Sequence, residues 1–202
     1  MLVTFVVTRP ASTPPTPVTR FAVALPTSHA LAVSVNDRDL AISSDGTHLV
    51  YTAGAEPQLM IRAFDRLDAV PLAGITNARA PFLSPDGQWV GFFDRLDEGH
   101  GTSILRDGYL KRVLITGGPP VVICRVRGGS RGASWGPDDT IVFATSDPSS
   151  GLLRISARAG EPIVLTRPDP AKDEQDHFFP SVLPGGRGVL FTIVGARRPV
   201  ER

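Results

Sequence analysis

The sequence predicts an all-β fold, namely a partial β-propeller of about four blades, each of them a four-stranded antiparallel sheet. Two observations predict this fold. A pattern of 13 residues recurs four times at intervals typical of a propeller blade. The turn-forming residues, 20 Gly and 19 Pro, are distributed between short apolar runs. No window shows a sustained apolar stripe of helical period, so we expect few helices.

The four copies of the pattern define the predicted hairpins. They lie at residues 41–53, 81–93, 133–145 and 180–192, where they read AISSDGTHLVYTA, PFLSPDGQWVGFF, ASWGPDDTIVFAT and PSVLPGGRGVLFT. Aligned on Asp45, Asp86, Asp138 and Gly185, the copies are 41, 52 and 47 residues apart, which is a blade-length period. Each copy reads as a strand, a tight turn and a second strand with alternating apolar residues.

The predicted turns use residues with known turn chemistry. Proline presets φ at the first turn position, and glycine adopts the positive φ of a tight return. Ser44 replaces the proline in the first copy, which weakens the turn preference. Asp139 replaces the glycine in the third copy, where aspartate tolerates the left-handed region. The predicted turn positions are Ser44, Asp45, Gly46, Pro85, Asp86, Gly87, Pro137, Asp138, Asp139, Pro184, Gly185 and Gly186.

Further strands are predicted between the hairpins, at residues 59–64, 69–72, 110–115, 121–124, 152–156 and 163–165. Four strands joined by short turns make up a propeller blade. Residues 94–108 lengthen the second interval, and we expect a surface loop there. Aromatic residues at matched positions are expected to pack between blades; they are Trp89, Phe92, Phe93, Trp135 and Phe143.

The blades are expected to occupy residues 20–202, preceded by a disordered segment at residues 1–19. Residues 9–19 (RPASTPPTPVT) contain four prolines and predict an extended linker. Residues 1–7 (MLVTFVV) are apolar but too short to span a membrane, and they lack the charged start of a signal peptide. Two interpretations remain open: the end of a longer upstream membrane helix, or an unstructured leader.

Composition excludes several classes of function. A formal net charge of +1 does not favour nucleic acid as a partner. Cys124 is the only cysteine, so neither an intrachain disulfide nor a thiolate zinc cluster can form. The acidic residues Asp173, Glu174 and Asp176 lack the spacing of a calcium loop. No metal or other cofactor is predicted, since the histidines also lack metal-ligand spacing; they are His29, His48, His100 and His177.

The sequence contains no complete catalytic site. Residues 128–132 (GGSRG) match the pattern of a hydrolase nucleophile elbow, but that elbow lies between a strand and a helix, whereas strand and turn follow Ser130. The candidate ligand site is His177, Asp176 and Arg131, because His177 follows the acidic residues 169–176 and precedes two phenylalanines. We expect His177 in a solvated loop. Arg131 is expected to form a solvated basic cluster with Arg125 and Arg127.

The S-P-D-G turn followed by an aromatic-rich strand resembles the TolB-type WD-like repeat. RFAVALP at residues 20–26, SPDGQWVGFF at 84–93, RGASWGPDDTIVFA at 131–144 and HFFPSVLPGGRGVLFT at 177–192, with the Pro-rich lead-in, are together similar to the C-terminal propeller of bacterial eukaryotic-like serine/threonine protein kinases. The resemblance covers almost the whole chain. It implies a cytoplasmic kinase domain, one membrane helix, and a propeller on the extracytoplasmic, periplasmic side that senses or binds a ligand.

The kinase motifs themselves are missing from the chain. It has no V-A-I-K, H-R-D or D-F-G segment, so it cannot transfer a phosphoryl group alone. We therefore expect a non-catalytic sensing or protein-interaction module, with a protein or small-molecule ligand at the propeller face and membrane attachment only through an upstream helix. Two alternatives remain, the gating propeller of a prolyl-oligopeptidase-like hydrolase and a TolB-like periplasmic scaffold.

The number of predicted blades also indicates whether the propeller ring is complete. The resemblance implies six or more blades, so four copies predict an incomplete ring with exposed strand edges. Residues 21–25 are expected to supply a strand that would complete the last blade.

Overall fold

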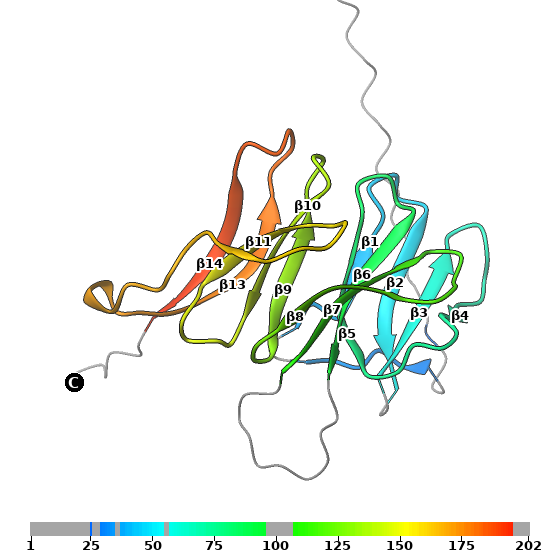
Figure 1. Cartoon of the computed structure of the whole chain (residues 1–202). Coiled ribbons are helices and arrows are strands. Elements are labelled where there is room, and N and C mark those ends of the chain that lie inside the picture. The colour runs from blue at the N-terminus through cyan, green and yellow to red at the C-terminus, as the bar shows by residue number, and fades with distance from the viewer. Residues whose placement is uncertain (1–24, 26–28, 35–36, 55–56, 96–106, 196–202) are drawn as a thin grey trace, which may run out of the picture.

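The computed structural model describes residues 25, 29–34, 37–54, 57–95 and 107–195. Over these residues the chain forms four antiparallel sheets that stand side by side (Figure 1). Three sheets contain four strands each, in the order in which the strands occur in the sequence. The last sheet has two strands within the described residues. The predicted all-β fold is confirmed, although the fourth sheet is smaller than the four strands expected of it.

The strands of the four sheets follow in chain order. The first sheet consists of β1 (Leu40–Ile42), β2 (His48–Ala53), β3 (Gln58–Ala63) and β4 (Val70–Pro71). The second consists of β5 (Ala78–Leu83), β6 (Trp89–Arg95), β7 (Gly108–Leu114) and β8 (Val121–Val126). The third consists of β9 (Ser130–Trp135), β10 (Thr140–Thr145), β11 (Leu152–Ser156) and β12 (Ile163–Val164). A short 3-10 turn, η2 (Pro170–Lys172), precedes the fourth sheet of β13 (Glu174–Val182) and β14 (Val189–Gly195).

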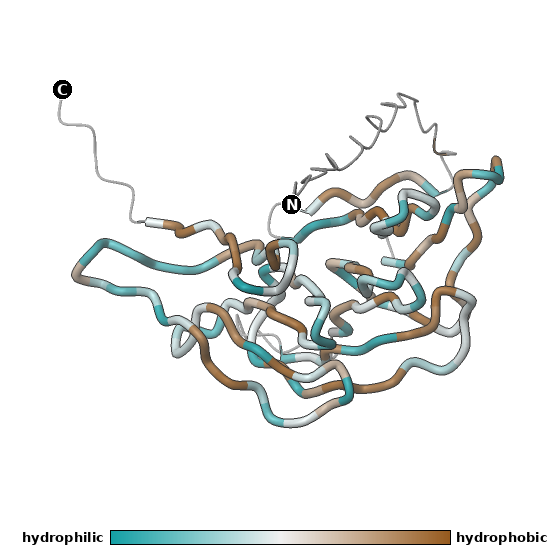
Figure 2. Tube along the Cα trace, turned by 90° about the horizontal axis from the view of Figure 1, so that it is seen from above, coloured by the Kyte–Doolittle hydropathy of each residue, from teal (hydrophilic) through white to brown (hydrophobic). Residues whose placement is uncertain are grey.

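Helical structure is scarce in these parts of the chain. The described ranges contain no α-helix, and none of their segments could cross a membrane as a helix. Figure 2 shows hydrophobic stretches that alternate with hydrophilic ones along the described chain. This distribution is typical of sheets that are buried against each other on their faces.

The loop expected at residues 94–108 is shorter than predicted, because strands extend into it from both ends. Asp94 pairs with Tyr109, and Arg95 pairs with Gly108, so the ladder between β6 and β7 extends into the segment. A composition rich in charged residues and glycine predicts a loop, but the backbone continues to pair as long as the neighbouring strand provides partners. Residues 96–106 of this expected loop, like residues 21–24 of the expected additional strand, lie outside the described residues.

Apolar side chains fill the space between successive sheets. Between the second and third sheets the rings of Phe82 and Trp135 lie 6.1 Å apart, and those of Phe93 and Phe143 lie 6.2 Å apart. Phe92 is buried between the first and second sheets. Tilted aromatic pairs at these distances add to the free energy gained by burying the rings. The expected aromatic packing between sheets is thus confirmed.

The two ends of the stack of sheets differ. The outer face of the first sheet is covered, because Leu25 and Leu31 pack against Tyr51 and Met60. The last strand, β14, exposes large apolar side chains instead, with Leu190 at 67% and Ile193 at 49% exposure. One end of the stack is therefore apolar and accessible.

The first strands of the second, third and fourth sheets share a backbone irregularity. Ala80 in β5, Gly132 in β9 and Phe179 in β13 have positive φ values of 48°, 91° and 53°. Each lies six residues before an aligned turn position, Asp86, Asp138 or Gly185. The strand register shifts near each of them. A β-bulge of this kind bends the strand and redirects the side chains that precede it.

Candidate functional site

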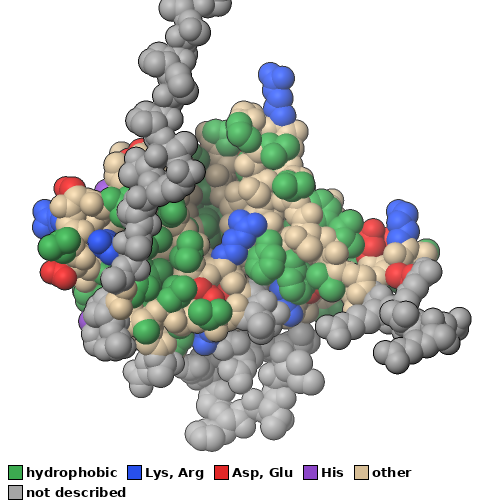
Figure 3. Space-filling model, turned by 180° about the vertical axis from the view of Figure 1, so that it is seen from behind, with side chains coloured by type: hydrophobic (Ala, Val, Ile, Leu, Met, Phe, Trp, Pro, Cys, Tyr) green, Lys and Arg blue, Asp and Glu red, His purple; other side chains and the backbone are tan. Residues whose placement is uncertain are grey.

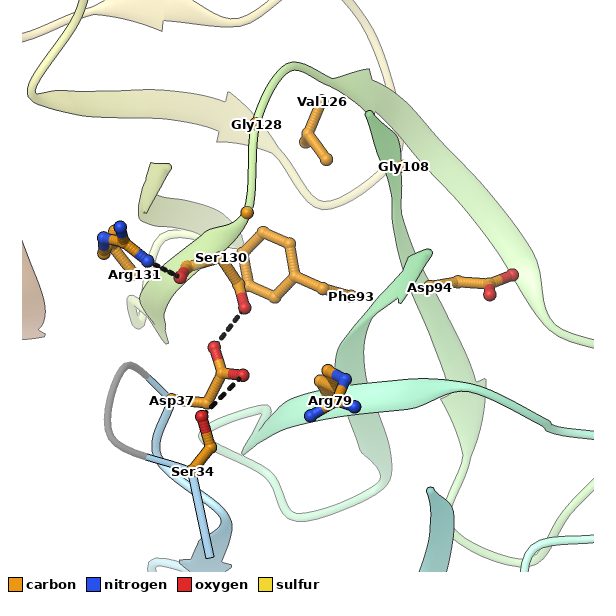
Figure 4. A pocket seen from close by; sticks show the side chains of 11 residues that line it. Ser34, Asp37, Arg79, Phe93, Asp94, Gly108, Val126, Gly128, Ser130 and Arg131 are labelled. Carbon is orange, nitrogen blue, oxygen red and sulfur yellow. Dashed lines mark hydrogen bonds between the residues drawn. The ribbon is translucent and has the colours of Figure 1, made fainter. Parts of the chain in front are cut away.

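The first strand of each sheet lies innermost in the stack, and the starts of these four strands meet at one end of the molecule. β1 contacts β5, β5 contacts β9, and β9 contacts β13, so these four strands form the inner wall of the stack. A cavity of about 90 Å³ lies where the chain enters β1, β5 and β9 (Figure 4). Its walls carry charged and hydroxyl side chains from segments that are far apart in the sequence. We define this cavity as the mouth cavity.

A carboxylate and a hydroxyl join two walls of the mouth cavity. The Ser130 hydroxyl, at the start of β9, donates a hydrogen bond to Oδ1 of Asp37, which precedes β1 (Figure 4). The Ser34 hydroxyl donates to the other oxygen of Asp37 at 3.3 Å. The Ser34 backbone N–H donates to Oδ2 of Asp39 at 2.5 Å. Burial raises the pKa of Asp39 in spite of this hydrogen bond.

Arg79 of β5 lies on another wall of the mouth cavity. Its Nε is buried, and within the described ranges it has no hydrogen-bond partner. The positive charge of Arg79 acts on the carboxylate of Asp39. No hydrogen bond or ion pair of the Arg79 guanidinium is found among the described residues. A guanidinium carries a full charge at every physiological pH, and a buried N–H of such a group without a partner costs free energy.

Two more arginines have partners: Arg131, which also lines the mouth cavity, and Arg38, which lines a neighbouring groove. Nε of Arg131 lies 3.3 Å from Oδ2 of Asp176, and the guanidinium of Arg131 lies 4.7 Å from the ring centre of Phe178. Nη2 of Arg38 donates to the carbonyl of Phe179 at 2.9 Å, and its Cζ lies 5.5 Å from the ring of that residue. These contacts join the fourth sheet to the first and the third.

Solved structures resemble this architecture, whereas no family model and no curated protein matches the chain. TolB from Acinetobacter baumannii aligns with a TM-score of 0.60 at 15% identity, over 82% of this chain and 38% of that chain. An oligogalacturonate lyase from Vibrio parahaemolyticus aligns with a TM-score of 0.58 at 15% identity, over 76% of this chain and 45% of its own. The chain has the β-propeller fold. A nidogen/laminin complex gives a TM-score of 0.57 at 12% identity, over 76% of this chain and 54% of that one.

This chain spans between 38% and 54% of the length of these propellers. Its sheets are therefore blades of a partial propeller, and the innermost strands line the axial channel. The mouth cavity lies at one end of the channel, and the hairpin turns lie at the other. Loops and strand ends at a channel mouth are a usual place for ligands in propellers, because they vary without disturbing the blades.

The three arginines occupy one position of the blade repeat. Arg38, Arg79 and Arg131 each lie seven residues before the turn aspartates Asp45, Asp86 and Asp138. Phe178 takes this position in the fourth blade. The sequence interpretation did not identify Arg38 and Arg79 as site residues. The constant spacing of seven residues between arginine and aspartate is the signal that could have found them.

The predicted ligand residues are only partly brought together. Arg131 and Asp176 form an ion pair, with side chains 18% and 20% exposed. The expectation that Arg131 is solvated is therefore wrong, because the bulge at Gly132 directs it against the fourth blade. Arg125 lies apart on β8, is 62% exposed and pairs with Asp107 at 3.1 Å.

His177 is buried, and the expectation of a solvated loop is wrong. β13 begins at Glu174, so His177 is a strand residue that pairs with Ile193 and is only 3% exposed. Its Nδ1 lies 2.7 Å from Oγ1 of Thr166, and its Nε2 lies 3.2 Å from Oε2 of Glu174. Successive strand residues face opposite ways, so His177 packs between the third and fourth blades, away from Asp176 and the mouth cavity.

The residues around Glu174 favour the ionised form of its carboxyl group. The backbone N–H of Asp169 donates to Glu174 at 2.9 Å, and His177 lies next to the same oxygen. These contacts lower the pKa of Glu174, the Asp169 hydrogen bond having the larger effect. The acidic stretch is thus partly a structured link between blades, not a uniformly solvated segment.

Ser130 does not lie in a hydrolase geometry. It opens strand β9, and its hydroxyl partner is the carboxylate of Asp37. The buried His177 makes its contacts with Thr166 and Glu174. Among the described residues, no three His, Cys, Asp or Glu side chains are arranged to hold a metal ion.

The hairpin turns lie at the opposite end of the channel. Gly46, Gly87 and Gly186 have φ values of 70°, 69° and 71°, and Asp139 has a φ of 59°. Oδ1 of Asp139 also accepts a hydrogen bond from Nε1 of Trp135 at 3.2 Å. Aspartate at this position therefore contributes a contact that glycine could not.

A groove of about 480 Å³ follows the inner strands between the two ends. Exposed apolar side chains line it, including Leu40, Ile42 and Leu183. In the view from behind, hydrophobic side chains gather beside a hollow in the molecule (Figure 3).

Proposed function

We propose that this chain is a non-catalytic binding module, the sensor portion of a bacterial membrane serine/threonine protein kinase, which takes a ligand at the channel mouth. The observation that carries the proposal is the mouth cavity. Three successive blades each contribute a polar or charged side chain to it, Asp37, Arg79 and Ser130, and Arg79 has no hydrogen-bond partner among the described residues. A site with an unsatisfied charged group and no assembled catalytic group is suited to recognition.

The link to a kinase is supported by the repeat motifs and the Pro-rich lead-in, which resemble the propellers of bacterial eukaryotic-like kinases. That resemblance also supports a position on the extracytoplasmic side of the membrane. The propeller fold alone does not carry this link, since the same fold hosts binding proteins and enzymes. The oligogalacturonate lyase among the similar structures is one such enzyme.

The coding sequence on both sides of this chain tests the proposal. A serine/threonine kinase domain and a membrane helix encoded before residue 1 are the expected result. An α/β-hydrolase domain encoded after residue 202 would instead make these blades the gating propeller of a prolyl-oligopeptidase-like hydrolase. A signal peptide with neither enzyme domain would make the chain a TolB-like scaffold. Either of the latter results would overturn the kinase assignment.

A further inference from the structure

Arg38, Arg79 and Arg131 occupy the same position of the blade repeat, but they differ in whether they have a hydrogen-bond or ion-pair partner. Arg38 donates to the Phe179 carbonyl, and Arg131 pairs with Asp176 and donates to the Ser130 carbonyl at 3.2 Å. Arg79 makes no such contact within the described ranges, and its Nε is buried. A guanidinium stays protonated throughout the physiological range, so loss of charge cannot relieve this state. The cation of Arg79 is therefore available for an anion that enters the mouth cavity.

The carboxylates around Arg79 are already engaged. Asp37 accepts hydrogen bonds from Ser34 and Ser130, and Asp39 accepts one from the Ser34 backbone. Asp94 pairs with Lys111 and points away from Asp37 and Ser130 (Figure 4). Each of these acids has its own donor, and none of them is hydrogen-bonded to Arg79 in the described part of the chain.

The size and charge of the mouth cavity restrict the anion. Its volume of about 90 Å³ is smaller than that of a cavity of about 150 Å³ that holds a benzene molecule. Asp37 and Asp39 lie nearby, and their charges disfavour a doubly charged anion such as phosphate. A planar carboxylate with one charge matches the two-pronged donor geometry of a guanidinium.

We propose that the mouth cavity binds a small carboxylate anion, with the guanidinium of Arg79 as its main contact. The biological meaning of this binding rests on the proposed function, because it names the class of ligand that the module would sense. The binding itself depends only on the cavity. A kinase assignment refuted by the neighbouring coding sequence would leave it unchanged.

Nuclear magnetic resonance of the ¹⁵N-labelled 202-residue chain tests the proposal. Sodium acetate is titrated at constant ionic strength and pH 7, and the Nε–H resonance of Arg79 and the amides of Gly128 and Gly129 are followed. We expect saturable shifts at these positions. Acetamide, which has nearly the same shape without the charge, is expected to give none, because the charge-assisted hydrogen bond is lost.

Variants locate the contact. Arg79→Met is expected to weaken acetate binding by about tenfold or more. Arg79→Lys keeps the charge but lacks the planar fork, so an intermediate loss is expected. Arg66→Met, an exposed arginine in the turn after β3, is the matched control and is expected to leave the affinity unchanged.

Two results would overturn the carboxylate proposal. One is a linear, unsaturable response of the wild-type chain to acetate, or an equal response to acetamide. The other is an affinity for acetate that is the same in Arg79→Met as in the wild type. If Arg79→Met does not fold, the comparison of acetate with acetamide on the wild-type Arg79 resonance decides the question. A negative result leaves the kinase assignment to be decided by the neighbouring coding sequence.

Discussion

The hydroxyl of Ser130 donates a hydrogen bond to the carboxylate of Asp37, which lies 93 residues earlier in the chain. Asp37 leads into the first blade, and Ser130 opens the third, so the contact spans the inner edge of the second blade. The mouth cavity is consequently a product of the assembled propeller and does not exist in any single blade. Its stability and its binding properties are coupled to the packing of three blades.

Removing this hydrogen bond tests the coupling. Ser130→Ala leaves a partly buried carboxylate oxygen without its donor, so we expect a loss of about 1–3 kcal/mol in the free energy of unfolding. Urea denaturation followed by circular dichroism measures it. Ser181→Ala, at a serine whose side chain makes no hydrogen bond within the described part of the chain, is the control and should change stability by less than about 0.5 kcal/mol. Equal effects of the two substitutions would contradict the role of the contact.

The packing between blades has a steric test at Gly91 of β6. A Cβ atom at this position would lie 2.2 Å from Cζ of Phe82, whose ring packs 6.1 Å from that of Trp135. Gly91→Ala must displace the Phe82 ring, and we expect a loss of about 1–3 kcal/mol. Gly129→Ala is the control, since its nearest neighbour would be Oγ of Ser146 at 3.8 Å. A Gly91→Ala variant as stable as the control would show that the ring is placed differently.

The stabilisation that Asp45 gives to the first hairpin turn is expected to decrease at low pH. Oδ1 of Asp45 accepts hydrogen bonds from the Ser43 hydroxyl at 2.5 Å and from the Thr47 backbone and hydroxyl at 3.0 and 2.8 Å. These contacts lower the pKa of Asp45 to about 2, the Ser43 hydrogen bond having the largest effect. The ordinary value is about 3.9. Because the folded-state pKa is lowered, the stabilisation is present above about pH 4 and is lost as the pH falls toward 2.

A carbon-13 titration of the Asp45 carboxyl measures this pKa directly. Ser43→Ala removes the strongest donor, so the pKa is expected to rise toward its ordinary value of about 3.9. The carboxyl of Asp86, whose pKa is lowered mainly by Ser84, serves as an internal control in the same spectrum and should not move. An unchanged Asp45 titration in the variant would refute the assignment of the shift to Ser43.

The exposed strand β14 predicts self-association. Leu190 is 67% exposed on a strand that has an unpaired edge among the described residues. Apolar edge strands favour pairing with other chains, and a charge on the strand opposes it. We expect Leu190→Lys to raise the protein concentration at which light scattering detects aggregates. Leu67→Lys, at a leucine 88% exposed in the turn after β3, is the control. A comparable rise in both variants would point to net charge as the cause.

The sequence predicts the hairpins well because their determinants are local. Pro85, Asp86 and Gly87 bring a preset φ, a side-chain acceptor and a positive φ to three consecutive positions, and the turn follows from them. The bulges at Ala80 and Phe179 have no such signal. Neither residue type favours a positive φ, so their conformation is imposed by the pairing of β5 with β6 and of β13 with β14.

The mouth cavity was only partly predictable, because its contacts also depend on residues that are distant in the sequence. The equal spacing of Arg38, Arg79 and Arg131 is present in the sequence, but which of them finds a partner depends on where the fourth blade places Asp176 and Phe179. The burial of His177 also depends on distant residues. Gly151 leaves it room, since a Cβ there would lie 2.3 Å from its Nδ1.

The central claim is that the channel mouth binds a ligand without transforming it, and an activity measurement on the purified chain tests this claim most directly. The chain is incubated with p-nitrophenyl acetate, with oligogalacturonate, and with ATP and a serine-containing peptide. Our account predicts no turnover above a protein-free blank, while the same sample shows the acetate-dependent shift at Arg79. Reproducible turnover that is lost in Ser130→Ala and kept in Ser181→Ala would contradict it.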